Sequence, residues 1–218
     1  MGGDRIVYEY GGYIYLFDTN TKQAKKVTVE INNSEEYSRP EWKNVSSQIM
    51  SMDVAPGGER MVVSARGDIF TLPAKEGITY NLTNSSNAND QDALYSPDGK
   101  YISYVSDKDG EFNIRLRETA TGKEHALLKN IKTYIYTYAW SPDSKKILWS
   151  EKKNTLNITD VATGKTELVE ESGISGFQSF NWSPDSEWIT YERPEKDMTN
   201  IIVYNVDSKQ KHVITDGW

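Results

Sequence analysis

Few residues of this sequence have the types and spacing that chemistry requires. Asp107, Asp109 and Glu111 alternate around Gly110, and carboxylate oxygens at such spacing are ligands that calcium prefers. The segment lacks the remaining ligands of an EF-hand loop, and an Asp-Gly pair between two apolar segments is a strong hairpin signal. We therefore predict a turn here, with a metal site at these three carboxylates as the alternative.

Nucleophilic catalysis has few residues available. The chain has two histidines, His125 and His212, which we expect on outer strands, far from each other. A serine–histidine–acid group needs all three side chains within hydrogen-bonding reach. The sequence contains no Gly-x-Ser-x-Gly turn and no phosphate-binding Gly-x-x-x-x-Gly-Lys loop. It predicts a chain that is not itself an enzyme and that holds no cofactor.

Aromatic side chains offer a different kind of site. The chain has 14 tyrosines and 6 tryptophans, and residues 134–140 alternate on a segment expected to be an innermost strand. Trp140 and Trp182 stand at equivalent positions, where we expect them to fill the space between neighbouring sheets. Tyr134 and Trp42 are the candidates for a surface that binds a peptide or a carbohydrate.

Composition and charge exclude several classes of function. Lysine and arginine number 25 and aspartate and glutamate 32, so the formal charge of the 218 residues is −7. An acidic chain is a poor partner for the phosphates of nucleic acid. The absence of cysteine excludes disulfides and thiolate metal sites, and no apolar stretch is long enough to span a membrane. The N-terminus has no signal region, and the absence of cysteine together with an acidic charge suits either a cytoplasmic or a periplasmic location.

A repeated phrase shows which elements would position these residues. A short apolar strand, a Ser/Ala-Pro-Asp/Gly-Gly/Ser turn and a second apolar strand recur, with the prolines at Pro56, Pro97, Pro142 and Pro184. From each proline to the next is 41, 45 and 42 residues. A period of about 40–45 residues with four strands per unit is typical of a β-propeller blade.

Each repeat contains signals for three strands after its proline turn. The second strands are expected at Arg60–Ser64, Tyr101–Ser106, Lys146–Ser150 and Glu187–Glu192, and the third strands at Asp68–Leu72, Phe112–Arg117, Thr155–Thr159 and Asn200–Asn205. The outer strands are expected near Asn81–Thr83, His125–Leu128, Glu167–Val169 and His212–Thr215. Ser144 and Ser186 replace the glycine of the turn, and a positive φ would cost each about 1 kcal/mol.

The repeats predict an all-β propeller of about five four-stranded blades, one without its innermost strand. The expected parts are a partial blade over 1–30 (strands Arg5–Tyr10, Tyr13–Phe17 and Ala24–Val29), a connection over 31–46, and blades over 47–84, 85–130, 131–171 and 172–218. We expect one arc, cut from a longer propeller, and exposed strand edges of such an arc favour self-association.

The turns and strands also resemble a known family. The units look like the TolB-type propeller repeat, whose Trp-Ser-Pro-Asp-Gly-Lys phrase is close to residues 95–100. A more specific likeness lies in residues 50–115. Ala65-Arg66-Gly67-Asp68-Ile69-Phe70, the turn Pro73-Ala74-Lys75-Glu76-Gly77, Asn81-Leu82-Thr83 and Ser106-Asp107-Lys108-Asp109-Gly110-Glu111 resemble the propeller of tricorn-like serine peptidases.

This resemblance implies a function for the longer protein of which the segment would be a part. In that family, propellers precede a PDZ-like module and a catalytic region with a serine nucleophile, which nothing in this sequence matches. The resemblance implies a non-catalytic segment that gates peptide substrates and holds a serine peptidase together. Its partners would be peptides or proteins and the remaining domains of the parent chain.

Two other functions remain open. One is a self-contained TolB-like module that binds a protein or a peptide at one face of the ring. The other is a propeller enzyme that acts on glycans with carboxylates in its channel, for which Asp53 and Asp92 are the inner-strand acids. A propeller fold does not decide among these, since it hosts many functions.

Overall fold

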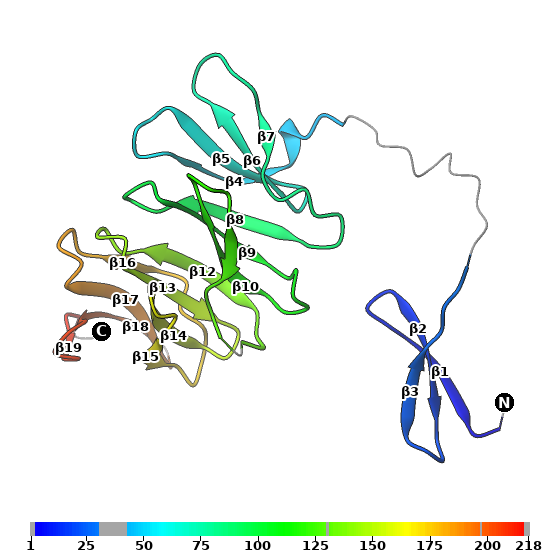
Figure 1. Cartoon of the computed structure of the whole chain (residues 1–218). Helices are drawn as coiled ribbons and strands as arrows, with labels where there is room; N and C mark the ends of the chain where they lie inside the picture. Colours follow the sequence, from blue (N-terminus) through cyan, green and yellow to red (C-terminus); the bar gives the residue numbers. More distant parts are fainter. Residues whose placement is uncertain (1–2, 31–42, 130, 197, 216–218) are drawn as a thin grey trace. The chain divides into compact units, whose positions relative to one another are not determined.

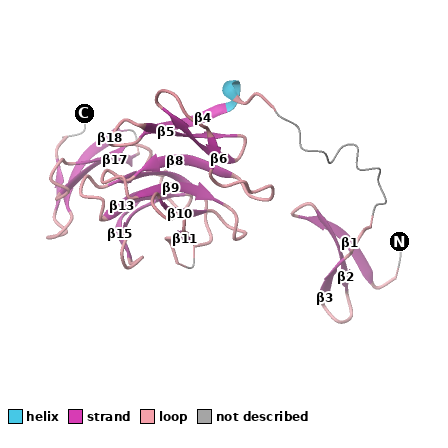
Figure 2. Ribbon diagram, turned by 45° about the horizontal axis from the view of Figure 1, so that its top comes forward, coloured by secondary structure: helices cyan, strands magenta, loops and turns pink. Residues whose placement is uncertain are grey.

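The prediction of an all-β propeller architecture is confirmed by the computed structural model, which describes residues 3–30, 43–129, 131–196 and 198–215. Strands dominate the described chain, and its helical part is one turn of 3₁₀ helix at Ser46–Gln48 (Figure 2). The strands form one three-stranded and four four-stranded antiparallel sheets, each a meander in chain order (Figure 1). Within the described residues no helix is long and apolar enough to cross a membrane.

The three-stranded sheet is here called the N-terminal sheet, and the others are numbered as blades. The N-terminal sheet is β1 (Arg5–Tyr10), β2 (Tyr13–Asp18) and β3 (Gln23–Lys26). The first blade is β4 (Ile49–Val54), β5 (Arg60–Ala65), β6 (Asp68–Pro73) and β7 (Tyr80–Asn81). The second is β8 (Asp90–Tyr95), β9 (Tyr101–Ser106), β10 (Asn113–Glu118) and β11 (Glu124–Ala126). The third is β12 (Ile135–Trp140), β13 (Lys146–Glu151), β14 (Thr155–Asp160) and β15 (Thr166–Glu171). The fourth is β16 (Phe180–Trp182), β17 (Trp188–Glu195), β18 (Met198–Asn205) and β19 (Lys211–Val213).

The proline turns join the innermost strand of each blade to the second. Gly58 and Gly99 have φ of +74° and +72°, and Ser144 and Ser186 have φ of +62° and +64°. The serines therefore adopt the left-handed conformation that glycine adopts without strain. Each hydroxyl has a partner in the preceding blade, because Ser144 Oγ accepts the N–H of Asp98 and Ser186 Oγ accepts that of Asp143, both at 3.0 Å. The serine turns thus link blades as well as turning the chain.

Hydrophobic cores lie between consecutive blades. Val62 and Ile69 of the first blade pack with Ile102 and Tyr104 of the second. The other two cores lie between the second and third blades, around Ile114, Leu116, Ile147 and Trp149, and between the third and fourth, around Leu148, Leu156, Ile189 and Tyr191. Alternation along β13 sends Ile147 and Trp149 to one neighbour and Leu148 to the other. Each inner blade is therefore covered on both faces.

The chain divides into two compact units, residues 1–43 and 44–218. The first contains the N-terminal sheet and the second the four blades. The predicted connection 31–46 lies largely outside the described residues. That all five sheets belong to one arc stays a prediction.

The central hairpin of the fourth blade is longer than expected. The sequence pattern predicted strands ending at Glu192 and beginning at Asn200, whereas β17 continues to Glu195 and β18 begins at Met198. The extra pairs are Arg193 with Asn200, Pro194 with Thr199 and Glu195 with Met198. Proline cannot donate a ladder hydrogen bond, so Pro194 is a weak strand signal, yet it lies within β17. The outer strands β3 and β7, in contrast, end earlier than predicted, at Lys26 and Asn81, whereas β15 is longer than predicted.

Candidate functional site

The three carboxylates proposed for a metal lie at the β9–β10 turn. Asp107 accepts the backbone N–H of Asn89 at 2.7 Å, and Asp109 forms an ion pair with Arg115 at 2.6 Å. Glu111 is exposed. Among the described residues, no group of three or more acidic or histidine side chains is placed to hold a metal ion. Asp107 and Asp109 thus hold the turn to the rest of the second blade.

The two histidines lie on outer strands of different blades. His125 is on β11, paired with Leu116, and His212 is on β19, paired with Val203. Both side chains are exposed, and His212 lies against the ring of Trp188, with 6.2 Å between the ring centroids. Within the described residues, no hydrogen bond joins either histidine to a serine or a carboxylate.

The aromatic candidates separate into buried and exposed groups. Trp140 is buried and donates its indole N–H to Ser103 at 2.7 Å, as expected for a residue between blades. Trp182 packs partly buried against the core between the third and fourth blades. Tyr134 is 41% exposed and contacts Phe112 and Tyr136 edge-on, at centroid distances of 5.0 and 5.8 Å. Trp42 lies outside the described residues.

The inner-strand acids connect the first three blades. Asp53 on β4 accepts the backbone N–H of Tyr95 on β8 at 2.7 Å. Asp92 has a φ of +54° at a register shift in β8, and its carbonyl accepts the Tyr138 hydroxyl at 2.6 Å. Burial raises the pKa of the Asp92 carboxyl and of the Tyr138 hydroxyl above their usual values. Through this hydrogen bond the third blade stabilises the strained bulge in β8 of the second blade.

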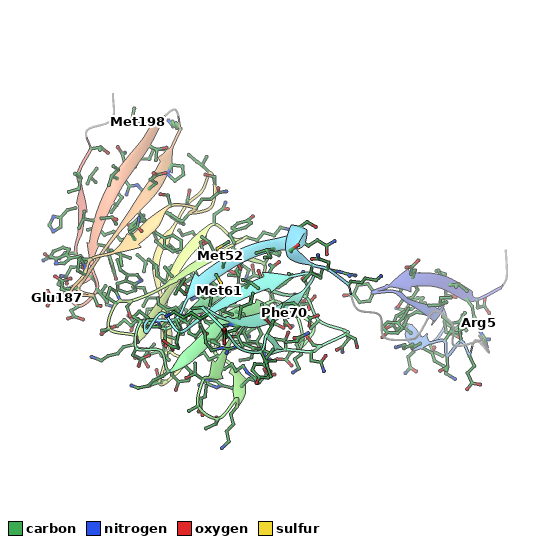
Figure 3. The ribbon with its side chains drawn as sticks, turned by 90° about the horizontal axis from the view of Figure 1, so that it is seen from above. Arg5, Met52, Met61, Phe70, Glu187 and Met198 are labelled. Carbon is green, nitrogen blue, oxygen red and sulfur yellow. The ribbon has the colours of Figure 1, made fainter. Side chains whose placement is uncertain are left out.

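A cleft that the sequence reasoning missed lies between the third and fourth blades. The segment Glu171–Ile174 forms one side, and Arg193, Pro194 and Met198 of the long β17–β18 hairpin form the other, around a volume of about 590 Å³. Figure 3 shows Met198 at the end of this hairpin. The signal was present in the sequence, because seven residues separate the strand signals that end at Glu192 and begin at Asn200, whereas three separate those that end at Ser64 and begin at Asp68 in the first blade.

Similarity to a known family decides what kind of propeller this is. A family model described as the tricorn protease second beta propeller domain matches residues 49–218. The chain belongs to this family. The likeness recognised in residues 50–115 is thereby confirmed, and the matched region begins at the first residue of β4. The matched region contains all four blades, β4 to β19.

Individual relatives agree with this assignment. A tricorn protease homolog from Saccharolobus solfataricus is 25% identical over 221 residues, covering 98% of this chain but 19% of the relative. The crystal structure of the tricorn protease matches 99% of this chain and 21% of that chain, with a TM-score of 0.70 and 18% identity. This tricorn-type chain therefore spans about one fifth of the proteins named tricorn.

TolB propellers share the fold. TolB from Acinetobacter baumannii matches 98% of this chain and 52% of its own, with a TM-score of 0.61 and 20% identity. A TolB from Agrobacterium tumefaciens matches 99% of this chain and 78% of its own, with a TM-score of 0.61 and 16% identity. At such identities the likeness concerns the fold, which the TolB-type repeat phrase had indicated.

Proposed function

We propose that this chain is a non-catalytic propeller segment that gates peptide substrates and supports the assembly of a serine peptidase. The match of residues 49–218 to a tricorn propeller is the observation that carries the proposal. A relative named a tricorn protease homolog extends over about five times the length that this chain covers, which leaves room for a separate catalytic region.

The chemistry of the described residues supports a role in binding. The exposed histidines lie on outer strands of separate blades, and the candidate carboxylates Asp107 and Asp109 hold a turn. Exposed tyrosines and a cleft of ligand size lie on the third and fourth blades. Such surfaces suit contacts with a passing polypeptide and need no reactive group.

The proposal is tested with this chain and a long unfolded polypeptide, such as reduced and carboxymethylated lactalbumin. We expect measurable binding by fluorescence anisotropy and no new peptide products by mass spectrometry. Cleavage that disappears in a His125→Ala or His212→Ala variant would contradict the non-catalytic role. Binding no tighter than that of a similarly charged unrelated protein would contradict the substrate-gating role.

A further inference from the structure

Arg193 lines the cleft between the third and fourth blades and has an unmet hydrogen-bonding requirement. Its side chain is 28% exposed, and one guanidinium nitrogen pairs with Glu195 of the same hairpin. Its Nε is buried and has no hydrogen-bond partner among the described residues. Glu195 therefore leaves part of the hydrogen-bonding capacity of the guanidinium unused, and a further acceptor on the guanidinium would be favourable.

The nearby carboxylate Glu170 cannot readily fill this role. It accepts the hydroxyl of Tyr191 at 2.8 Å and the ammonium of Lys211 at 2.9 Å. Burial acts to raise the pKa of Glu170, but these two hydrogen bonds and the positive charges of Lys211 and Arg193 lower it. Glu170 therefore stays ionised and gives its hydrogen bonds to Tyr191 and Lys211, while Arg193 acts on it through charge alone.

The remaining walls of the cleft combine apolar and charged side chains. Ile174 is 56% exposed and Met198 37% exposed, and both line the cleft together with Pro194. Lys196 adds a second cation on the same hairpin, and the carboxylates of Glu171 and Glu195 also line the cleft. A volume of about 590 Å³ lies within the range of about 300–1,000 Å³ that is usual for ligand pockets.

We propose that this cleft binds a peptide through a carboxylate next to an apolar side chain. Arg193 donates to the carboxylate, since guanidinium groups match carboxylate geometry and charge-assisted hydrogen bonds are the strong ones. The apolar side chain lies against Ile174 and Met198. This proposal rests on the peptide-gating function above and names a place on the chain where a peptide is held.

Anisotropy with three coumarin-labelled hexapeptides tests the proposal. The first is Gly-Ser-Gly-Ser-Ala-Leu with a free C-terminus, the second is its C-terminal amide, and the third is Gly-Ser-Gly-Glu-Ala-Leu amide. We expect the first or the third to bind about tenfold more tightly than the second, and which one does so distinguishes a terminal carboxylate from a side-chain carboxylate. Equal binding of all three overturns the proposal.

Matched variants assign the effect to the cleft. Arg193→Gln should remove the preference for a carboxylate, while Arg117→Gln should keep it, because Arg117 has a similar exposure of 25% on the second blade. Met198→Ser, at an exposed position, should weaken all three peptides several-fold and leave the preference intact. Loss of the preference in both arginine variants, or unchanged binding in the Met198 variant, contradicts the site.

The two proposals fail in different ways. If neither the unfolded polypeptide nor any hexapeptide binds, peptide gating itself is contradicted. If the polypeptide binds and Arg193→Gln leaves the carboxylate preference unchanged, the function stands and the assignment to this cleft is wrong.

Discussion

The N-terminal sheet and the third blade use nearly the same residues with opposite results. Arg5-Ile6-Val7-Tyr8 of β1 corresponds to Lys146-Ile147-Leu148-Trp149 of β13, and both strands begin an antiparallel hairpin. Ile6 is 53% exposed and Val7 66% exposed, whereas Ile147 and Leu148 are fully buried. The difference shows that local sequence forms a blade and that neighbouring blades bury it.

The first blade also differs from the inner blades, because it exposes apolar side chains on one face. Met52 is 63% exposed on β4, and Figure 3 shows it with Met61 and Phe70 on the first blade. Register places Met52, Val63 and Phe70 on one face, opposite the face that packs on the second blade. This face has the apolar composition of the faces with which the inner blades form cores against their neighbours.

The largest expected effect on stability comes from truncating an isoleucine of the third blade, and the isoleucine at the corresponding position of the N-terminal sheet is the comparison. Ile147→Ala should destabilise the chain by about 2–5 kcal/mol, since it opens a cavity between the second and third blades. Ile6→Ala, at the equivalent exposed position, should change the free energy of unfolding by about 0.5 kcal/mol or less. Urea unfolding followed by tryptophan fluorescence measures both. Similar losses in the two variants would mean that the sheets are buried alike.

A smaller loss is expected at the contact between the second and third blades. The Tyr138 hydroxyl donates to the Asp92 carbonyl and lies 3.0 Å from Ser103 Oγ. Tyr138→Phe should cost about 1–2 kcal/mol, because it removes the donor to a half-buried carbonyl at the β8 bulge. Tyr8→Phe in the N-terminal sheet is the control, with no measurable change expected. An unchanged urea midpoint in Tyr138→Phe would show that the β8 bulge does not depend on this hydrogen bond from the third blade.

Substitutions in the serine turns should change the stability still less, and the difference in stability between an alanine and a glycine variant is informative. Ser186→Ala keeps the positive φ and removes the hydroxyl that accepts the Asp143 N–H, so it should cost about 1 kcal/mol. Ser186→Gly loses the same bond and gains relief of strain, so its stability should lie close to that of the natural chain. Thermal unfolding compares the two. If alanine proves as stable as glycine, the hydroxyl link between blades contributes nothing.

Acid should weaken the link between the third and fourth blades slightly. Hydrogen bonds from Lys209 and Lys165 lower the pKa of Glu167 to about 2. The contribution of Glu167 is therefore complete above its ordinary pKa of 4.5 and is lost as the pH falls toward 2. Because Glu167 is 41% exposed, the change should be a few tenths of a kcal/mol. The urea midpoint at pH 5 and pH 3 should differ less in Glu167→Gln than in the natural chain.

Much of the fold was predictable, because each blade carries its own turn signals. The prolines at 56, 97, 142 and 184 located the four blades, and the strand signals after each proline turn placed the other strands within a few residues. The positive φ of Ser144 and Ser186 followed from their alignment with Gly99. Repetition supplied this information, since four copies of one phrase determine a spacing that one copy does not.

The candidate site was less predictable for a physical reason. Arg193, Ile174 and Met198 come from a loop and a hairpin of different blades, and the cleft exists only after those blades pack. Asp107 and Asp109 drew attention because they are close in sequence, yet their partners Asn89 and Arg115 belong to other segments. Short-range patterns reveal turns, whereas surfaces between blades depend on distant contacts.

Hydrogen exchange followed by mass spectrometry tests most directly whether neighbouring blades, and not local sequence, protect each sheet. We predict that peptides from β1–β3 exchange within seconds to minutes, while β9, β13 and β14 stay protected for hours because they lie within blades covered on both faces. Equal protection of β1 and β13 would contradict the account, and so would rapid exchange of β13.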